Sequence, residues 1–143
     1  MEKRLHKQRT PATRAGIKLV DKTGTLVLLV PQISNRWGIP KGGQKTGETL
    51  WEAAVRELYE EAGLDIRWLV YKLENIQWFD HVYASDLGAC IFTLRLQSPW
   101  TPVCHPVDDK DVCGNPKWTP IDTLKTLTLN YTTKLAFGLR LTK

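Results

Sequence analysis

The segment from Thr49 to Ala62 constrains the fold most, because it combines a helix start, a helical repeat and a helix stop. Thr49 and Glu52 form a capping-box pattern, which satisfies free backbone N–H groups in a first helical turn. Gly63 is typical of the residue that ends a helix. The apolar residues repeat at helical spacing: Leu50, Ala54, Val55, Leu58 and Ala62. This pattern predicts an amphipathic helix that buries one face.

Three glutamates border the apolar stripe of this helix. At about 100° per residue, Glu57, Glu60 and Glu61 fall within an arc of roughly 100°. Like charges at this spacing cost a few tenths of a kcal/mol per pair, and Arg56 can offset part of that cost. A divalent cation would offset it better, and an all-oxygen ligand set favours Mg²⁺ or Mn²⁺. The alternative is an ordinary solvated acidic face.

Strand-like runs and turns surround the helix. The expected strands are 15–20, 25–30, 66–77, 89–97 and 117–120, with a closing helix over 130–139. The first two strands flank turn residues and are expected to form a hairpin. The ranges 31–47 and 99–116 are expected to be loops, the second containing several aspartates. Strands around one strong helix predict a mixed α/β domain.

Composition fits a single globular domain. The 143 residues are 42% apolar and 24% charged, and the formal net charge is +5. We expect one domain over 15–143, preceded by a basic arm over 1–14 that is either a frayed terminus or a segment that gathers phosphate-rich substrate. The charge excess is compatible with an anionic partner of several kinds.

Other classes of protein are disfavoured. The longest apolar stretch, 26–30, is far shorter than a membrane span, and no apolar segment of a secretory signal follows the basic start. The three cysteines, Cys90, Cys104 and Cys113, contain no C-x-x-C pair and match no standard zinc spacing. We therefore expect a cytoplasmic protein without a membrane partner. The sequence does not indicate an oligomeric state.

The helix belongs to a longer pattern that is very specific. The 23 residues from Gly42 to Leu64 match G-x5-E-x7-R-E-U-x-E-E-x-G-U, where U is a bulky aliphatic residue. A chance match in a chain of this length is of order one in ten million. The fixed positions are Gly42, Glu48, Arg56, Glu57, Leu58, Glu60, Glu61, Gly63 and Leu64. The segment resembles the Nudix box of Nudix hydrolases.

The resemblance implies a Nudix-type α/β/α sandwich with a mixed β-sheet. It also implies that Glu57, Glu60 and Glu61, together with the backbone carbonyl of Lys41, hold Mg²⁺, with Mn²⁺ as a substitute. Arg56 would anchor the box by ion pairing, and Glu48 would orient the site. The activity implied is hydrolysis of a pyrophosphate linkage by metal-activated water.

The general base is left open by the sequence. Glu57 is one candidate, because a carboxylate beside the metal can accept the proton of the attacking water. Family members differ at this step, and some use an acid from a distant loop. Here Asp109 and Asp111 are the loop candidates, and Asp80 and Asp86 are weaker ones.

Residues 37–42 form a W-x-x-P-K-G segment that is similar to Nudix enzymes acting on long polyphosphates. Arg36 and Lys41 are expected to contact phosphates, and Gly42 and Gly43 allow the backbone to approach them. An aromatic cluster is expected either to stack a base or to form a buried edge. Its members are Trp78, Phe79, His81 and Tyr83.

Nucleoside or dinucleoside polyphosphates, RNA 5′ ends included, are therefore the expected substrates. Diphosphoinositol polyphosphates are the alternative, since the stretch over 56–63 is also close to the enzymes that hydrolyse them. A hypothesis of another class is a non-catalytic Nudix-like module that binds RNA or phosphates. The presence of all the box acids favours the enzyme.

Overall fold

A computed structural model describes residues 13–33, 35–80, 88–108 and 112–139. In chain order its elements are β1 (Arg14–Val20), β2 (Leu26–Pro31), β3 (Trp37–Gly38), β4 (Lys41–Gly43), α2 (Leu50–Ala62), the 3₁₀ helix η1 (Ile66–Trp68), β5 (Tyr71–Phe79), β6 (Ala89–Leu96), β7 (Lys117–Pro120), the 3₁₀ helix η2 (Ile121–Thr126) and α3 (Tyr131–Ala136). Most of the predicted arm lies outside the described residues, and Arg14 is the first residue of β1.

The described strands form one mixed sheet in the order β3-β2-β1-β6-β5, with β4 also paired to β1 and β7 to β2. β1 and β6 run parallel, in register from Arg14 opposite Ala89 to Val20 opposite Arg95. The remaining strand pairs are antiparallel, including the predicted hairpin of β1 and β2. The prediction of a mixed sheet is therefore confirmed.

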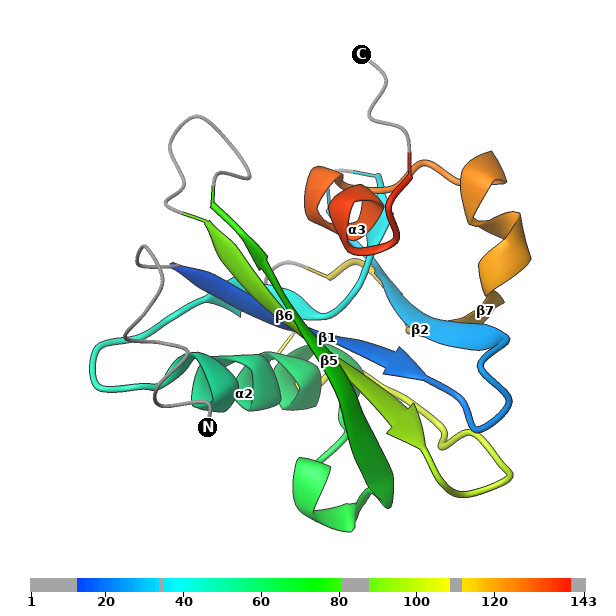
Figure 1. Cartoon of the computed structure of the whole chain (residues 1–143), viewed down its shortest axis with the longest axis horizontal. Helices are drawn as coiled ribbons and strands as arrows, with labels where there is room; N and C mark the ends of the chain where they lie inside the picture. The colour runs from blue at the N-terminus through cyan, green and yellow to red at the C-terminus, as the bar shows by residue number, and fades with distance from the viewer. Residues whose placement is uncertain (1–12, 34, 81–87, 109–111, 140–143) are drawn as a thin grey trace.

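Helices cover both faces of this sheet (Figure 1). Alternate residues of β1, such as Ile17 and Leu19, belong to a core cluster shared with the apolar face of α2. Val27 and Leu29 of β2 belong to a second cluster, which includes residues of η2 and α3. Side chains of a strand point alternately to opposite faces, so one sheet supplies both cores. This is the predicted α/β/α sandwich.

The helix α2 matches its prediction closely. The Thr49 side chain accepts a hydrogen bond from the Glu52 N–H at 3.0 Å, and the Glu52 carboxylate accepts one from the Thr49 N–H at 2.8 Å. Gly63 ends the helix with φ of 72°, in the left-handed region that favours glycine. A β-carbon at Gly63 would also collide with the carbonyl of His105. Gly63 therefore ends the helix and leaves room for the loop that packs on it.

Several predicted boundaries were wrong. The range 31–47 contains two short strands, because β4 pairs with β1 and β3 pairs with β2. The predicted strand 66–77 begins only at Tyr71, since the Asp65 side chain caps the 3₁₀ helix η1. The closing helix ends at Ala136, shortly before Gly138 with φ of 63°. No helix among the described residues has the length and apolar character needed to cross a membrane.

Candidate active site

The last two turns of α2 place three glutamates at one end of a cavity of about 170 Å³. Glu57 and Glu61 are buried, and Glu60 is half-buried. The described residues that line it are Gly43, Lys45, Arg56, Glu57, Glu60, Glu61 and Asp108. The structure therefore brings together the three glutamates that the sequence predicted as metal ligands.

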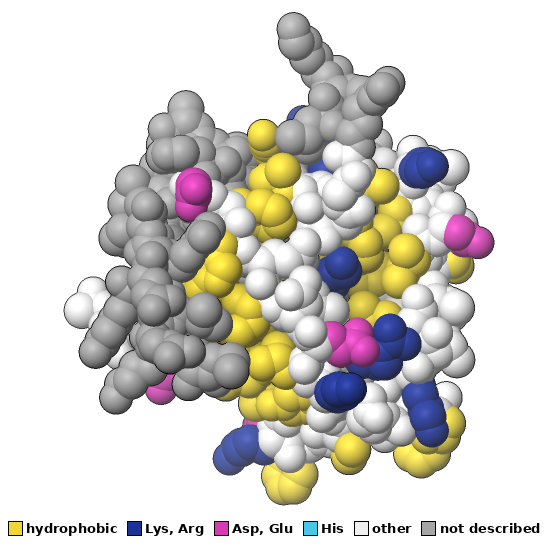
Figure 2. All heavy atoms as spheres, viewed as in Figure 1, with side chains coloured by type: hydrophobic (Ala, Val, Ile, Leu, Met, Phe, Trp, Pro, Cys, Tyr) yellow, Lys and Arg dark blue, Asp and Glu magenta, His cyan; other side chains and the backbone are white. Residues whose placement is uncertain are grey.

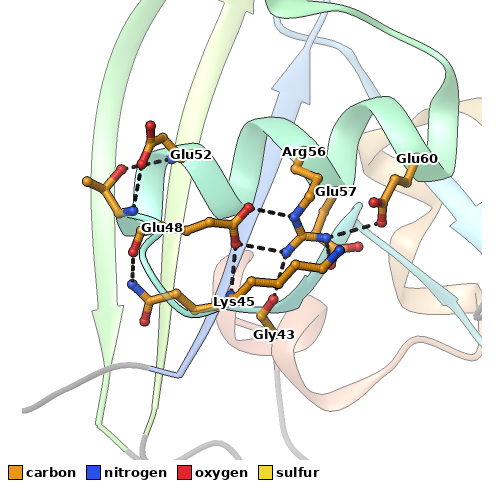
Figure 3. A network of polar contacts seen from close by, with 9 residues as sticks. Gly43, Lys45, Glu48, Glu52, Arg56, Glu57 and Glu60 are labelled. Carbon is orange, nitrogen blue, oxygen red and sulfur yellow. Dashed lines mark hydrogen bonds and ion pairs between the residues drawn. The ribbon is translucent and has the colours of Figure 1, made fainter.

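Arg56 ties the acidic end of α2 to the preceding loop (Figure 3). Its Nε and Nη2 atoms donate to the Glu48 carboxylate at 2.7 and 3.0 Å, and Nη2 also donates to the Gly43 carbonyl at 2.8 Å. Its Nη1 atom donates to Glu57 at 2.9 Å and to Glu60 at 3.2 Å. These bonds raise the pKa of Arg56 and lower that of Glu48. With five such bonds, Arg56 is suited to anchoring the box, as the resemblance implies.

Glu61 is the most deeply buried acid of the cavity, with 3% of its surface exposed. Its Oε1 accepts a hydrogen bond from the Lys41 N–H at 3.3 Å. Burial raises the pKa of Glu61 to about 9, and a hydrogen bond and the negative charge of Glu57 add to the effect. The carboxyl groups of Glu57 and Glu61 therefore form a close pair in which Glu61 retains its proton at neutral pH.

Gly42 makes room for this pair. A β-carbon at Gly42 would collide with the Glu57 carboxylate, so the absence of a side chain lets β4 approach the helix. Gly16 of β1 has a similar role, because its β-carbon would lie 2.6 Å from the Lys41 β-carbon. Both glycines therefore support the close contact of β1, β4 and α2.

The acids of the cavity fit a divalent cation by their chemistry. Their donors are carboxylate oxygens, which Mg²⁺ and Mn²⁺ prefer. A cation can also replace the proton that Glu61 retains. Over the described ranges, no three His, Cys, Asp or Glu side chains already converge as a metal site. The fit thus rests on the donor type and the paired acids of the cavity.

Asp108 is a cavity residue that the sequence did not single out. The loop after β6 reaches α2 through the Val107 and Asp108 N–H groups, which donate to the Glu60 carbonyl at 2.8 and 2.9 Å. The His105 N–H donates to the Ala62 carbonyl at 3.0 Å. Carbonyls in the last turn of a helix lack partners within the helix, which explains this docking. The loop candidates Asp109 and Asp111 lie outside the described residues.

Most of the residues that the sequence suggested for phosphate contact are not among the described residues that line the cavity. Lys41 is 7% exposed, and neither it nor the exposed Arg36 is among the described residues that line the cavity. Gly43 lines the cavity, whereas Gly42 packs directly against the Glu57 carboxylate. The cavity lysine is Lys45, which the sequence did not suggest.

The predicted aromatic cluster is divided by the sheet. Trp78 of β5 packs against the core on the α2 side, whereas Phe79 packs against the core on the α3 side. These adjacent rings therefore point to opposite faces. The other two members, His81 and Tyr83, lie outside the described residues, as does Asp86. Asp80 is described and exposed, and it is not among the residues that line the cavity.

Solved structures support the assignment of the fold. An Ap4A hydrolase of C. elegans, in a binary complex, has a TM-score of 0.64 at 21% identity, covering 82% of this chain and 85% of that one. The NUDIX domain of Shewanella oneidensis NrtR, in complex with ADP ribose, has a TM-score of 0.65 at 15% identity, covering 92% and 88%. At these identities the likeness concerns the fold.

Sequence relatives include two RNA pyrophosphohydrolases. The protein of Bartonella tribocorum is 40% identical over 57 residues, which are 40% of this chain and 32% of that protein. The protein of Edwardsiella ictaluri is 35% identical over 94 residues, or 57% and 53% of the two chains. The matches thus span between about a third and a half of these relatives. The sequence model of the NUDIX domain matches residues 10–136 of this chain, most of its length. The chain therefore belongs to the NUDIX domain family.

Proposed function

We propose that this chain hydrolyses a pyrophosphate linkage in a nucleoside or dinucleoside polyphosphate, RNA 5′ ends included, with Mg²⁺ as its cofactor. The observation that carries the proposal is the cavity at the end of α2, where three box glutamates and Asp108 meet. The similarity to RNA pyrophosphohydrolases supports the choice of substrate, since it exceeds 30% identity over the matched segments.

The cavity receives the phosphate chain and not the whole substrate. Its volume of about 170 Å³ lies below the roughly 300–1,000 Å³ of pockets that enclose a drug-sized ligand. A nucleoside or a longer RNA would therefore lie outside it. Its polar lining of carboxylates, Arg56 and Lys45 suits a phosphate and its counter-ion.

Glu57, Glu60 and Glu61 are the residues that would hold the cation. When bound, Mg²⁺ neutralises phosphate oxygens and lowers the pKa of a bound water. Arg56 keeps the Glu57 and Glu60 carboxylates on the cavity side of α2 through the bonds at 2.9 and 3.2 Å. The Lys41 N–H orients Glu61 in the same way.

One carboxylate must also accept the proton of the attacking water. Among the described residues, Asp108 and Glu57 line the cavity and can do so. Asp108 belongs to the loop after β6 and not to the box helix, so it can act on a water while the helix glutamates hold the cation. This placement favours Asp108 as the base, with Glu57 kept for the cation.

A phosphate-release screen tests the proposal. The substrates are dinucleoside polyphosphates, triphosphorylated RNA, diphosphoinositol phosphates and nucleotide sugars, each with Mg²⁺ and with EDTA. We expect release from the first two, abolished by EDTA and by Glu60→Gln. Glu52→Gln is the matched control, because it removes the same charge from the exposed first turn of α2 and glutamine can still complete the capping box.

The other outcomes separate the alternatives. Release mainly from diphosphoinositol phosphates would transfer the proposal to that substrate class. No release from any substrate, in a folded protein that still binds RNA, would refute the enzyme and support a binding module.

A further inference from the structure

Lys45 is a basic residue of the cavity whose ammonium group is not engaged in an ion pair with another described residue. Among the described residues, the lining contains two basic side chains, Arg56 and Lys45. Arg56 already makes five hydrogen bonds, to three carboxylates and the Gly43 carbonyl. Within the described part of the chain, the Lys45 ammonium forms no ion pair at 4.0 Å or less.

The backbone of Lys45 is fixed although its side chain is exposed. Its N–H donates to the Glu48 carboxylate at 2.8 Å, and the Gln44 side chain donates to the Glu48 carbonyl at 2.6 Å. Glu48 is itself held by Arg56. Figure 3 shows the Lys45 side chain extending from this loop past Arg56 toward Glu57. The loop thus presents an ammonium at the edge of the acidic cavity.

We propose that Lys45 binds the phosphate chain of the substrate beside the box glutamates, and that it favours pyrophosphate-bearing anions over a single phosphate. This inference rests on the proposed function. An ammonium forms charge-assisted hydrogen bonds with phosphate oxygens, and it gains more as the charge of the chain increases. Lys41, the lysine that the sequence suggested for this role, is buried and is not among the described residues that line the cavity.

Calorimetry with inorganic pyrophosphate and with orthophosphate, both in Mg²⁺, tests this role apart from turnover. Lys45→Met removes the charge and keeps the length of the side chain, and Lys45→Arg restores a cation. Lys22→Met is the matched control, because Lys22 is exposed in the turn at the far end of β1. Thermal unfolding of each variant shows whether the fold is intact.

In Lys45→Met we expect the pyrophosphate Kd to rise about five- to tenfold at low salt, with a smaller change for orthophosphate. Lys45→Arg should stay within about twofold of the wild type, and Lys22→Met should not differ from it. With a substrate from the screen, KM should rise in parallel while kcat changes by less than about twofold.

An unchanged pyrophosphate Kd in a folded Lys45→Met variant would overturn the inference. A lower melting temperature without a change in Kd would do the same, since Lys45 would then only stabilise the loop. If pyrophosphate binding depends on Lys45 but no substrate is hydrolysed, the inference stands and the proposed activity fails. If the wild type does not bind pyrophosphate, both fail.

Discussion

Replacing Glu61 by glutamine should make the protein more stable in EDTA at alkaline pH. The pKa of Glu61 is raised by burial to about 9 from an ordinary value of 4.5. Between these values the native state keeps a proton that the unfolded chain has released, so the contribution of Glu61 to stability is greatest below pH 4.5 and declines toward pH 9. Glutamine resembles the protonated acid in size and does not titrate, so Glu61→Gln removes this loss.

The size of the effect follows from the proton linkage. One proton contributes about 1.4 kcal/mol per pH unit, so the wild type should lose roughly 2–3 kcal/mol relative to Glu61→Gln between pH 6 and pH 8. For a chain of this length, that difference corresponds to roughly 5–10 °C in Tm. Glu61 is almost fully buried, so solvent screens the effect only weakly.

Urea unfolding at pH 6, 7 and 8 measures the difference directly, with Glu52→Gln as the exposed control on the same helix. In EDTA the wild type and Glu52→Gln should show the same pH slope, and Glu61→Gln a shallower one. Mg²⁺ should flatten the wild-type slope, because a bound cation lowers the pKa of its ligands. Equal slopes for the wild type and Glu61→Gln in EDTA would refute the assignment of a retained proton to this pair.

Two further substitutions test the contacts around the site, and a third tests how α3 packs against the segment before β4. Gly42→Ala places a methyl group against the Glu57 carboxylate, so it should lower the free energy of unfolding in urea by about 1–3 kcal/mol and should lower kcat. Full activity of this variant would contradict the close contact between Gly42 and Glu57. Arg56→Lys keeps the positive charge but loses the several N–H donors of the guanidinium group, and it should lower Tm by an amount equivalent to about 1–3 kcal/mol. An unchanged Tm would mean that the charge of Arg56 alone matters. Thr133→Val leaves the buried Ile39 N–H without its acceptor and should cost about 1–3 kcal/mol by urea unfolding. Thr133→Ser keeps the hydroxyl and loses one buried methyl group, so it should cost only about 0.8 kcal/mol.

Local signals explain why α2 could be predicted in detail. Its cap, its apolar stripe and its final glycine are all determined within a few residues of the helix. The positions of the three glutamates could be predicted equally well, because helix geometry alone places them on one side of α2. The part of the cavity formed by the three glutamates could therefore be predicted from the sequence.

The rest of the cavity depends on contacts between distant segments. β4 contains two glycines and exists because Lys41–Gly43 pairs with the start of β1, about 27 residues earlier in the chain. Asp108 reaches the cavity because its loop donates to the free carbonyls of α2. Spacing in the sequence does not encode these distant contacts, so Asp108 could not be identified from it. The bond from the Lys45 N–H to Glu48 is local, but the sequence does not show that the cavity forms beside Lys45.

The distribution of charge suggests how an anionic substrate reaches an acidic cavity. The chain has 20 basic and 15 acidic residues, and the described part of the cavity lining contains four of the acidic and two of the basic residues. The remainder of the chain is therefore more basic than the whole, and on the face shown in Figure 2 the basic side chains are dispersed instead of forming one patch. A dispersed positive surface attracts a polyphosphate from a distance but does not fix it in place. Fixing it requires countercharge inside the cavity, where Arg56 is already engaged. The cation held by the glutamates and the ammonium of Lys45 would supply that countercharge, so the surface charge governs the rate of encounter and the cavity governs which anion stays bound.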